Sequence, residues 1–202
     1  MIDAVAVVAL ALLFATAAWQ DLRTREIDVK IFAAMAPLAA LLVVENWGSP
    51  FYFFSLGVGL LLALLMRVFG SGYADSLAMA AISTAPPLLP YLPTPFVVVI
   101  SGTPLLLATV LWLYLLNRRR PCKMTRFEML THICVSRQEF LRNPLKYVVG
   151  DVRDMEHYDP SKVEIKDWVK AKYGVPYVVF LAAGFAVYTL IFLLQKTAFG
   201  LM

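Results

Sequence analysis

The chain has 202 residues, of which 60% are hydrophobic and only 16% charged, and its mean hydropathy is +0.72. This composition excludes an ordinary water-soluble domain, which needs more polar surface, and indicates a membrane protein. The net charge of +4 arises in residues 118–172, which hold 13 basic and 8 acidic residues. Because no basic run there is interleaved with aromatic residues, we expect anionic lipid headgroups as partners and no nucleic acid.

The apolar stretches predict six transmembrane helices. The first stretch lacks a basic leader region and a small-residue cleavage site, so we expect it to be a retained span. Pro86, Pro87 and Pro90 are expected to kink or end the fourth helix. The predicted ranges are 3–20, 30–45, 51–69, 75–91, 95–116 and 175–195.

A polar segment, residues 117–174, separates the fifth span from the sixth. Its β-branched and aromatic stretches at 147–149 and 163–165 favour strands, and residues 127–140 favour a helix. The sequence therefore predicts an all-α polytopic membrane bundle of six helices, residues 1–116 and 175–202, with a small α+β cytoplasmic domain at 117–174.

The basic residues predict the orientation in the plasma membrane. With six spans, 17 of the 18 Lys and Arg residues fall on one face, and Lys196 is the exception. Short loops rich in Lys and Arg remain in the cytoplasm, so loops one, three and five are expected there. Both termini are expected outside.

Two cysteines and two histidines were weighed as metal ligands. Cys122, His132, Cys134 and His157 match no common zinc spacing, so we predict no metal and no cofactor. On the cytoplasmic side the two cysteines are expected to be reduced thiols.

Two acidic residues stand at the cytoplasmic ends of predicted spans. Asp21 closes the first helix and Asp75 opens the fourth, so opposite chain directions bring both to a similar depth. Two carboxyl groups about 3 Å apart share one proton. The ionised group can deprotonate a water that attacks a peptide carbonyl, and the protonated group can protonate the leaving amine. Such a pair hydrolyses peptide bonds without a metal.

Each acid also has a simpler interpretation, and the residues alone leave both open. Asp75 after Gly72 can cap the fourth helix. Asp21 can be an interfacial anchor paired with Arg25 four residues later. Glu26 and Asp28 are expected to form surface pairs with neighbouring basic residues, which contribute little to stability.

Three short segments resemble motifs of the type IV prepilin peptidases, and most closely those of archaeal preflagellin and prepilin peptidases. Residues 21–27, DLRTREI, resemble their Asp-x-Arg-x-x-x-Ile segment. Residues 72–75, GYAD, resemble their Gly-x-hydrophobic-Asp motif, and residues 173–177, YGVPY, are similar to the segment that starts their terminal helix.

The resemblance implies an intramembrane aspartyl protease that removes a short basic leader from precursor filament subunits. It implies that Asp21 and Asp75 are catalytic and that Gly72, Tyr73 and Ala74 support them. Ala74 departs from the strict Gly-x-Gly-Asp pattern of presenilin-like proteases and favours the prepilin branch. The first cytoplasmic loop lacks the tetracysteine insert of many bacterial relatives, so we expect cleavage without N-methylation.

Other functions remain open from the sequence. A small ion-coupled transporter would use Asp21 and Asp75 to bind a cation or relay protons, and would have broken helices or an acid near the midplane. A non-enzymatic partner of a secretion complex would tolerate loss of both acids. A different class of intramembrane protease would cut substrates that span the membrane. The oligomeric state is also left open.

Overall fold

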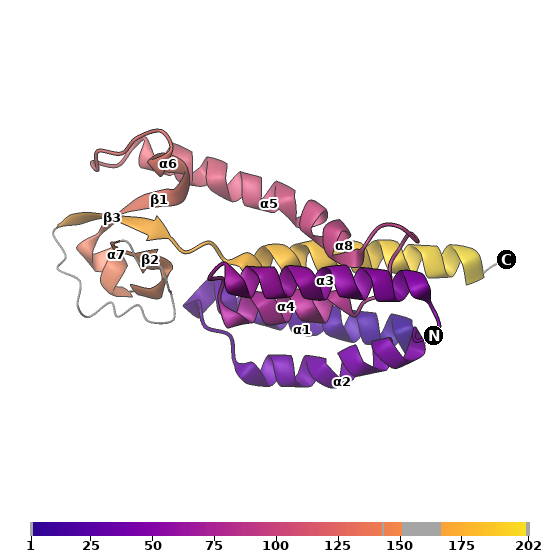
Figure 1. The fold of residues 1–202 in the computed structure, drawn as a ribbon. Helices are drawn as coiled ribbons and strands as arrows, with labels where there is room; N and C mark the ends of the chain where they lie inside the picture. The colour runs from indigo at the N-terminus through magenta and orange to yellow at the C-terminus, as the bar shows by residue number, and fades with distance from the viewer. Residues whose placement is uncertain (1, 143, 151–166, 201–202) are drawn as a thin grey trace. The chain divides into compact units, whose positions relative to one another are not determined.

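The computed structural model describes residues 2–142, 144–150 and 167–200, and it contains two compact units (Figure 1). The first unit comprises Met1–Pro104 and Tyr177–Met202, and the second comprises Leu105–Pro176. The division falls inside one long helix rather than at its end.

The first unit is helical throughout. Its elements are α1 (Ile2–Thr24), α2 (Val29–Glu45), α3 (Pro50–Val68), α4 (Tyr73–Ser83), the first part of α5 (Thr94–Asn117) and α8 (Tyr177–Gly200). Helix α8 packs against both α1 and α4, and α3 packs against α4.

The core of this unit is built where α1 and α8 meet. Val7, Leu10 and Phe14 recur at helical spacing on α1 and are fully buried. The Phe14 ring lies 5.1 Å from Phe185 of α8, and Phe185 stacks on Tyr188 at 5.3 Å. These contacts fix the two helices side by side.

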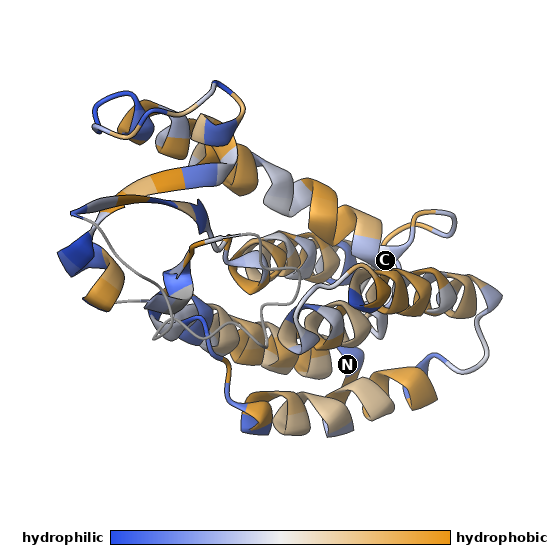
Figure 2. Cartoon of the chain, turned by 60° about the vertical axis from the view of Figure 1, so that its left-hand side comes forward, coloured by the Kyte–Doolittle hydropathy of each residue, from blue (hydrophilic) through white to orange (hydrophobic). Residues whose placement is uncertain are grey.

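Four helices, α1, α3, α5 and α8, are long and apolar enough to cross a membrane in the described part of the chain. Figure 2 shows mainly hydrophobic residues along these helices, and many of their large hydrophobic side chains are exposed. The membrane character expected from composition is therefore supported. Helix α2 has 17 residues and α4 has 11, so a six-span arrangement remains a prediction.

Helix α4 is shorter than predicted. It ends at Ser83 instead of continuing to residue 91. Pro86 and Pro87 have no N–H to continue the helical bonds, and a residue before proline disfavours helical backbone. The prediction of a helix over 75–91 is wrong beyond Ser83, although the expectation that the prolines end it is confirmed.

The backbone that follows α4 is buried, and hydroxyl groups from neighbouring helices satisfy its carbonyls. Tyr52 of α3 donates to Thr84 O at 2.9 Å, and Tyr188 of α8 donates to Pro86 O at 2.6 Å. Thr94 of α5 donates to Ala85 O at 2.9 Å. Irregular backbone at membrane depth is tolerated only when it is enclosed and bonded in this way.

Glycines allow the closest helix contacts. A Cβ at Gly59 of α3 would overlap Ser83 of α4, and a Cβ at Gly184 of α8 would overlap the Val98 carbonyl of α5. Membrane helices use small residues at such crossings because the backbones can then approach each other.

The second unit is a small sheet with short helices. After α5 come α6 (Glu128–Thr131), β1 (His132–Ser136), α7 (Arg137–Arg142), the 3-10 turn η1 (Pro144–Lys146), β2 (Tyr147–Val148) and β3 (Trp168–Tyr173). The strands are antiparallel in the order β1-β3-β2, with Cys134 opposite Lys170. The core of this unit contains Leu113, Ile133, Val135, Phe140 and Ala171.

The strand predicted at 147–149 is confirmed at residues 147–148, as β2. The helix predicted over 127–140 is present only in part, as α6 and the start of α7, because the strand β1 lies between them. Residues 132–136 form a strand because Ile133 and Val135 pack into the core while Cys134 faces the other side of the sheet. The strand predicted at 163–165 lies outside the described residues.

Candidate functional site

Asp21 lies in the last turn of α1, and only 8% of its surface is exposed. Arg25 Nη1 lies 3.8 Å from Asp21 Oδ1, and both side chains are largely buried. The chain reverses at Arg25, whose φ of 63° is unusual for a residue other than glycine. This turn keeps the Arg25 side chain next to the acid.

The N-terminus of α8 also faces Asp21. The backbone N–H groups of Val178 and Val179, in the first turn of α8, lie near enough to the Asp21 carboxylate to stabilise its negative charge. A helix N-terminus carries partial positive charge and favours an anion. Asp21 is therefore held by a guanidinium on one element and by peptide dipoles on another.

Asp75 is the third residue of α4 and is half-buried. The N-cap residue of α4 is Gly72, and Asp75 lies three residues after it in the first turn. The interpretation of Asp75 as the N-cap of this helix is therefore wrong. Its carboxylate still lies at the helix N-terminus, where the helix dipole favours a negative charge.

The structure places Asp21 and Asp75 near enough to each other for the charge of Asp21 to act on Asp75. Helix α8 packs against both α1 and α4 and so fixes the two helix ends relative to each other. Neighbouring like charges repel each other, so ionisation of both acids at once is disfavoured.

The supporting residues of the motif have different environments. A Cβ at Gly72 would meet only Asp75 Oδ2, at 3.8 Å, so this glycine is not required by packing in the structure. Tyr73 is 58% exposed, and the Arg67 guanidinium lies 3.6 Å from its ring centroid. Ala74 is half-buried. We infer that the Arg67–Tyr73 contact orders the loop before Asp75.

The loop after Asp21 borders an open hollow of about 640 Å³. Its lining includes Trp19, Arg23, Glu26 and Asp28, and Arg23 stacks over Trp19 at 4.2 Å. Asp28 caps α2 by accepting from Lys30 N at 2.9 Å, and its other oxygen lies 4.0 Å from Lys30 Nζ. The expected surface pair of Asp28 is present and exposed.

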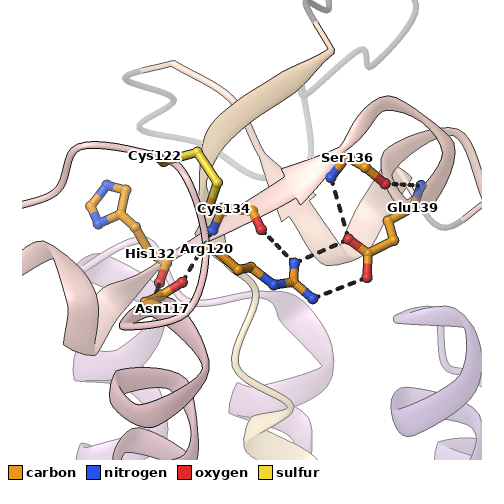
Figure 3. The surroundings of a disulfide bond; sticks show 7 residues. All are labelled: Asn117, Arg120, Cys122, His132, Cys134, Ser136 and Glu139. Carbon is orange, nitrogen blue, oxygen red and sulfur yellow. Dashed lines mark hydrogen bonds and ion pairs between the residues drawn. A yellow bond between two sulfur atoms is a disulfide. The ribbon is translucent and has the colours of Figure 1, made fainter.

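The two cysteines do not match the prediction. Cys122 and Cys134 form a disulfide, with their Cα atoms 5.7 Å apart (Figure 3). The loop after α5 turns back and places Cys122 beside β1, an approach that a separation of 12 residues does not reveal. Reduced thiols are therefore not the state in this structure.

Arg120 and Glu139 anchor the same region. Arg120 donates to both oxygens of Glu139 at 3.0 and 3.1 Å and also to the Cys134 carbonyl (Figure 3). Burial acts to raise the pKa of Glu139, but bonds from Arg120 and Ser136 outweigh it and leave that pKa lowered. Bidentate pairs of this kind are strong and geometrically specific, so Arg120 helps to hold the second unit together.

No group of three metal-ligating side chains gathers among the residues that the structure describes. His132 lies in the second unit, where its ring contacts the Thr131 hydroxyl at 2.8 Å. His157 lies outside the described residues.

The pairing of Asp21 with Arg25 four residues later, expected from the sequence, is confirmed, and both side chains are largely buried. No sequence pattern indicates that the amides of Val178 and Val179 lie near Asp21, because almost every residue has a backbone N–H.

The sequence matches no protein-family model, and no curated protein matches it.

Proposed function

We propose that this protein is a six-span membrane aspartyl endopeptidase. It removes the short basic leader from preflagellin-like or type IV prepilin-like precursors at the cytoplasmic face and does not N-methylate the product. The observation that carries the proposal is the placement of Asp21 and Asp75, 54 positions apart in sequence, within electrostatic reach of each other.

The surroundings of the two acids suggest a division of labour. Arg25 and the α8 amides compensate a negative charge on Asp21, which suits it to be the base. Asp75 experiences that charge and suits the role of the acid. Asp21 takes a proton from a water molecule while the oxygen of that water bonds to the carbonyl carbon of the scissile peptide bond. Asp75 gives its proton to the departing amine as the C–N bond breaks.

A cytoplasmic site follows from the basic residues of the adjacent loops. Arg23, Arg25 and Lys30 flank Asp21, and Arg67 precedes Asp75. Both acids then lie where the inner leaflet meets the cytoplasm, with the termini and Lys196 outside. This placement exposes the site to a leader that has not crossed the membrane.

An ion-coupled transporter is the second candidate, and one observation favours it. Helix α4 ends after 11 residues, and the carbonyls of the irregular backbone that follows it lie inside the bundle. Broken helices are typical of transporter sites. In this chain, however, hydroxyl groups already occupy the described carbonyls of Thr84, Ala85 and Pro86, which leaves them poorly suited to bind an ion.

The deciding experiment uses purified protein in liposomes with a precursor peptide. We expect Asp21→Asn and Asp75→Asn each to reduce leader removal by at least a thousandfold, while Asp28→Asn, which alters an exposed acid, leaves it largely intact. Retained cleavage in either variant of the pair would refute the dyad. The transporter would be established instead if the unmodified protein shows ion uptake but no cleavage in liposomes, and if both variants lose that uptake. If neither activity exists, a non-enzymatic assembly partner remains.

A further inference from the structure

A second cavity, lined by both charged and apolar residues, lies at the opposite end of the first unit from Asp21 and Asp75. Its volume is about 310 Å³, and Asp3, Pro86, Phe192 and Lys196 are among its lining residues. Asp3 and Asp21 lie 18 positions apart on one helix, which corresponds to about 27 Å along its axis. The cavity is therefore separate from the candidate catalytic site.

The cavity contains groups suited to bind an ammonium ion, and in the structure the ammonium group of Lys196 lies among them. Lys196 Nζ lies 3.4 Å from Asp3 Oδ2 and 5.5 Å from the centroid of the Phe192 ring. A carboxylate and an aromatic face together form a good environment for an organic cation. The Lys196 side chain is 52% exposed and the Asp3 side chain 19%, so the lysine is free to swing outward while the acid stays in place.

The walls around this arrangement are held firmly. The Tyr188 hydroxyl donates to Pro86 O at 2.6 Å, and the Tyr188 ring stacks on Phe192 at 5.9 Å. Pro86 and Pro87 are conformationally restricted, and both line the cavity. A site built on rigid groups loses little entropy when a ligand binds.

We propose that this cavity binds a small zwitterion, in which an ammonium group is joined by a short linker to a phosphate or carboxylate. The ligand ammonium takes the place of Lys196 Nζ between Asp3 and Phe192. Lys196 turns toward the ligand anion, so the original ion pair is exchanged for two new pairs. The volume lies at the small end of ligand sites, which suits a headgroup-sized molecule.

A zwitterion of this kind can come from two sources, which are the phosphoethanolamine headgroup of a lipid and a free molecule such as glycerophosphoethanolamine. Native mass spectrometry of the full-length protein in detergent, with phosphatidylethanolamine or phosphatidylglycerol added, measures the preference directly. We expect phosphatidylethanolamine to bind at least tenfold more tightly. Displacement by millimolar glycerophosphoethanolamine identifies the free molecule as a ligand, and its failure to displace identifies the lipid; both results support the site.

Charge-removing variants complete the test. Asp3→Asn and Lys196→Gln are each expected to weaken phosphatidylethanolamine binding at least tenfold. The matched controls Glu26→Gln and Lys30→Gln, at the far end of the same unit, should bind as the unmodified protein does. Equal binding of the two lipids by the unmodified protein, which needs no variant to fold, would overturn the proposal, as would full retention in Asp3→Asn or Lys196→Gln. Leader removal is a separate measurement, so the two proposals fail independently.

Discussion

Asp21 is a carboxylate for which the fold provides compensation from two directions. Arg25 approaches from the turn after α1, and the amides of Val178 and Val179 approach from the start of α8. Removing one partner of a buried charged pair is costly, because the remaining charge is left uncompensated. Arg25 is therefore a positioning residue in the proposed reaction.

We predict that Arg25→Gln lowers kcat for leader removal about tenfold to a hundredfold while KM changes little. Arg25→Lys keeps a positive charge near Asp21 and should recover much of the lost rate. Lys30→Gln removes an exposed charge at the start of α2 and serves as the control. Equal loss in the glutamine and lysine variants, or an effect on KM alone, would contradict the role assigned to Arg25.

Glycine at two neighbouring positions of α3 has different consequences for packing. A Cβ at Gly59 would overlap Ser83 and Pro95, whereas a Cβ at Gly57 meets nothing within 4 Å. Replacing each glycine with alanine therefore distinguishes the effect of packing, at Gly59, from the effect of helix propensity, at Gly57.

We predict that Gly59→Ala destabilises the protein by about 1–3 kcal/mol, because the α3–α4 crossing must widen. Gly57→Ala should be neutral or stabilising by up to about 1 kcal/mol, since alanine favours helix. Thermal unfolding in detergent compares the two variants. A Gly59→Ala protein that is as stable as Gly57→Ala would show that the close crossing is not retained in solution.

An ion pair links α6 to β3 in the second unit. Lys170 Nζ lies 2.5 Å from Glu128 Oε1, and together with a bond from Thr125 N this lowers the Glu128 pKa to about 2 from its usual 4.5. A carboxyl group whose pKa is lowered by folding stabilises the folded state at every pH above its ordinary pKa. This contribution is lost as the pH falls from about 4.5 to about 2.

We predict that carboxyl NMR finds Glu128 titrating near pH 2 in the unmodified protein and at a higher pH in Lys170→Met, where only the bonds from Thr125 still lower its pKa. Lys123→Met, which changes a loop lysine, should leave the titration unchanged. A Glu128 that titrates near 4.5 with Lys170 present would mean that the pair does not form in solution.

At the scale of the whole molecule, the charge distribution and the disulfide point to different compartments. Seventeen of 18 basic residues favour a cytoplasmic location for residues 117–174, whereas disulfides persist in oxidising compartments. Since Cys122 and Cys134 are the sole cysteines in the sequence, thiol labelling reports on this segment without ambiguity.

The proposed cytoplasmic location of residues 117–174 predicts that in intact cells the disulfide of the structure is reduced, and that both cysteines then react with a membrane-permeant maleimide and not with an impermeant one. The disulfide should form after an oxidant is added, because the fold already brings the two residues together. Labelling by the impermeant reagent, or a disulfide present in untreated cells, would place the segment outside. The catalytic proposal would then lose its cytoplasmic site.

The sequence by itself determined membrane residence and the positions of the helices that can cross a lipid bilayer. Runs such as those of α1, α3, α5 and α8 are apolar on all sides, so their character depends on local composition alone. The end of α4 was also foreseeable, because proline acts on its own neighbours in the chain.

The tertiary structure alone decided how distant residues meet. It placed Asp75 within reach of Asp21, buried Arg25 beside that acid, and joined Cys122 to Cys134. It also supplied the hydroxyls that cap the backbone after α4. These contacts depend on which helix faces pack together. That choice is made by burial and hydrogen bonding summed over the whole bundle, and no short stretch of sequence contains it.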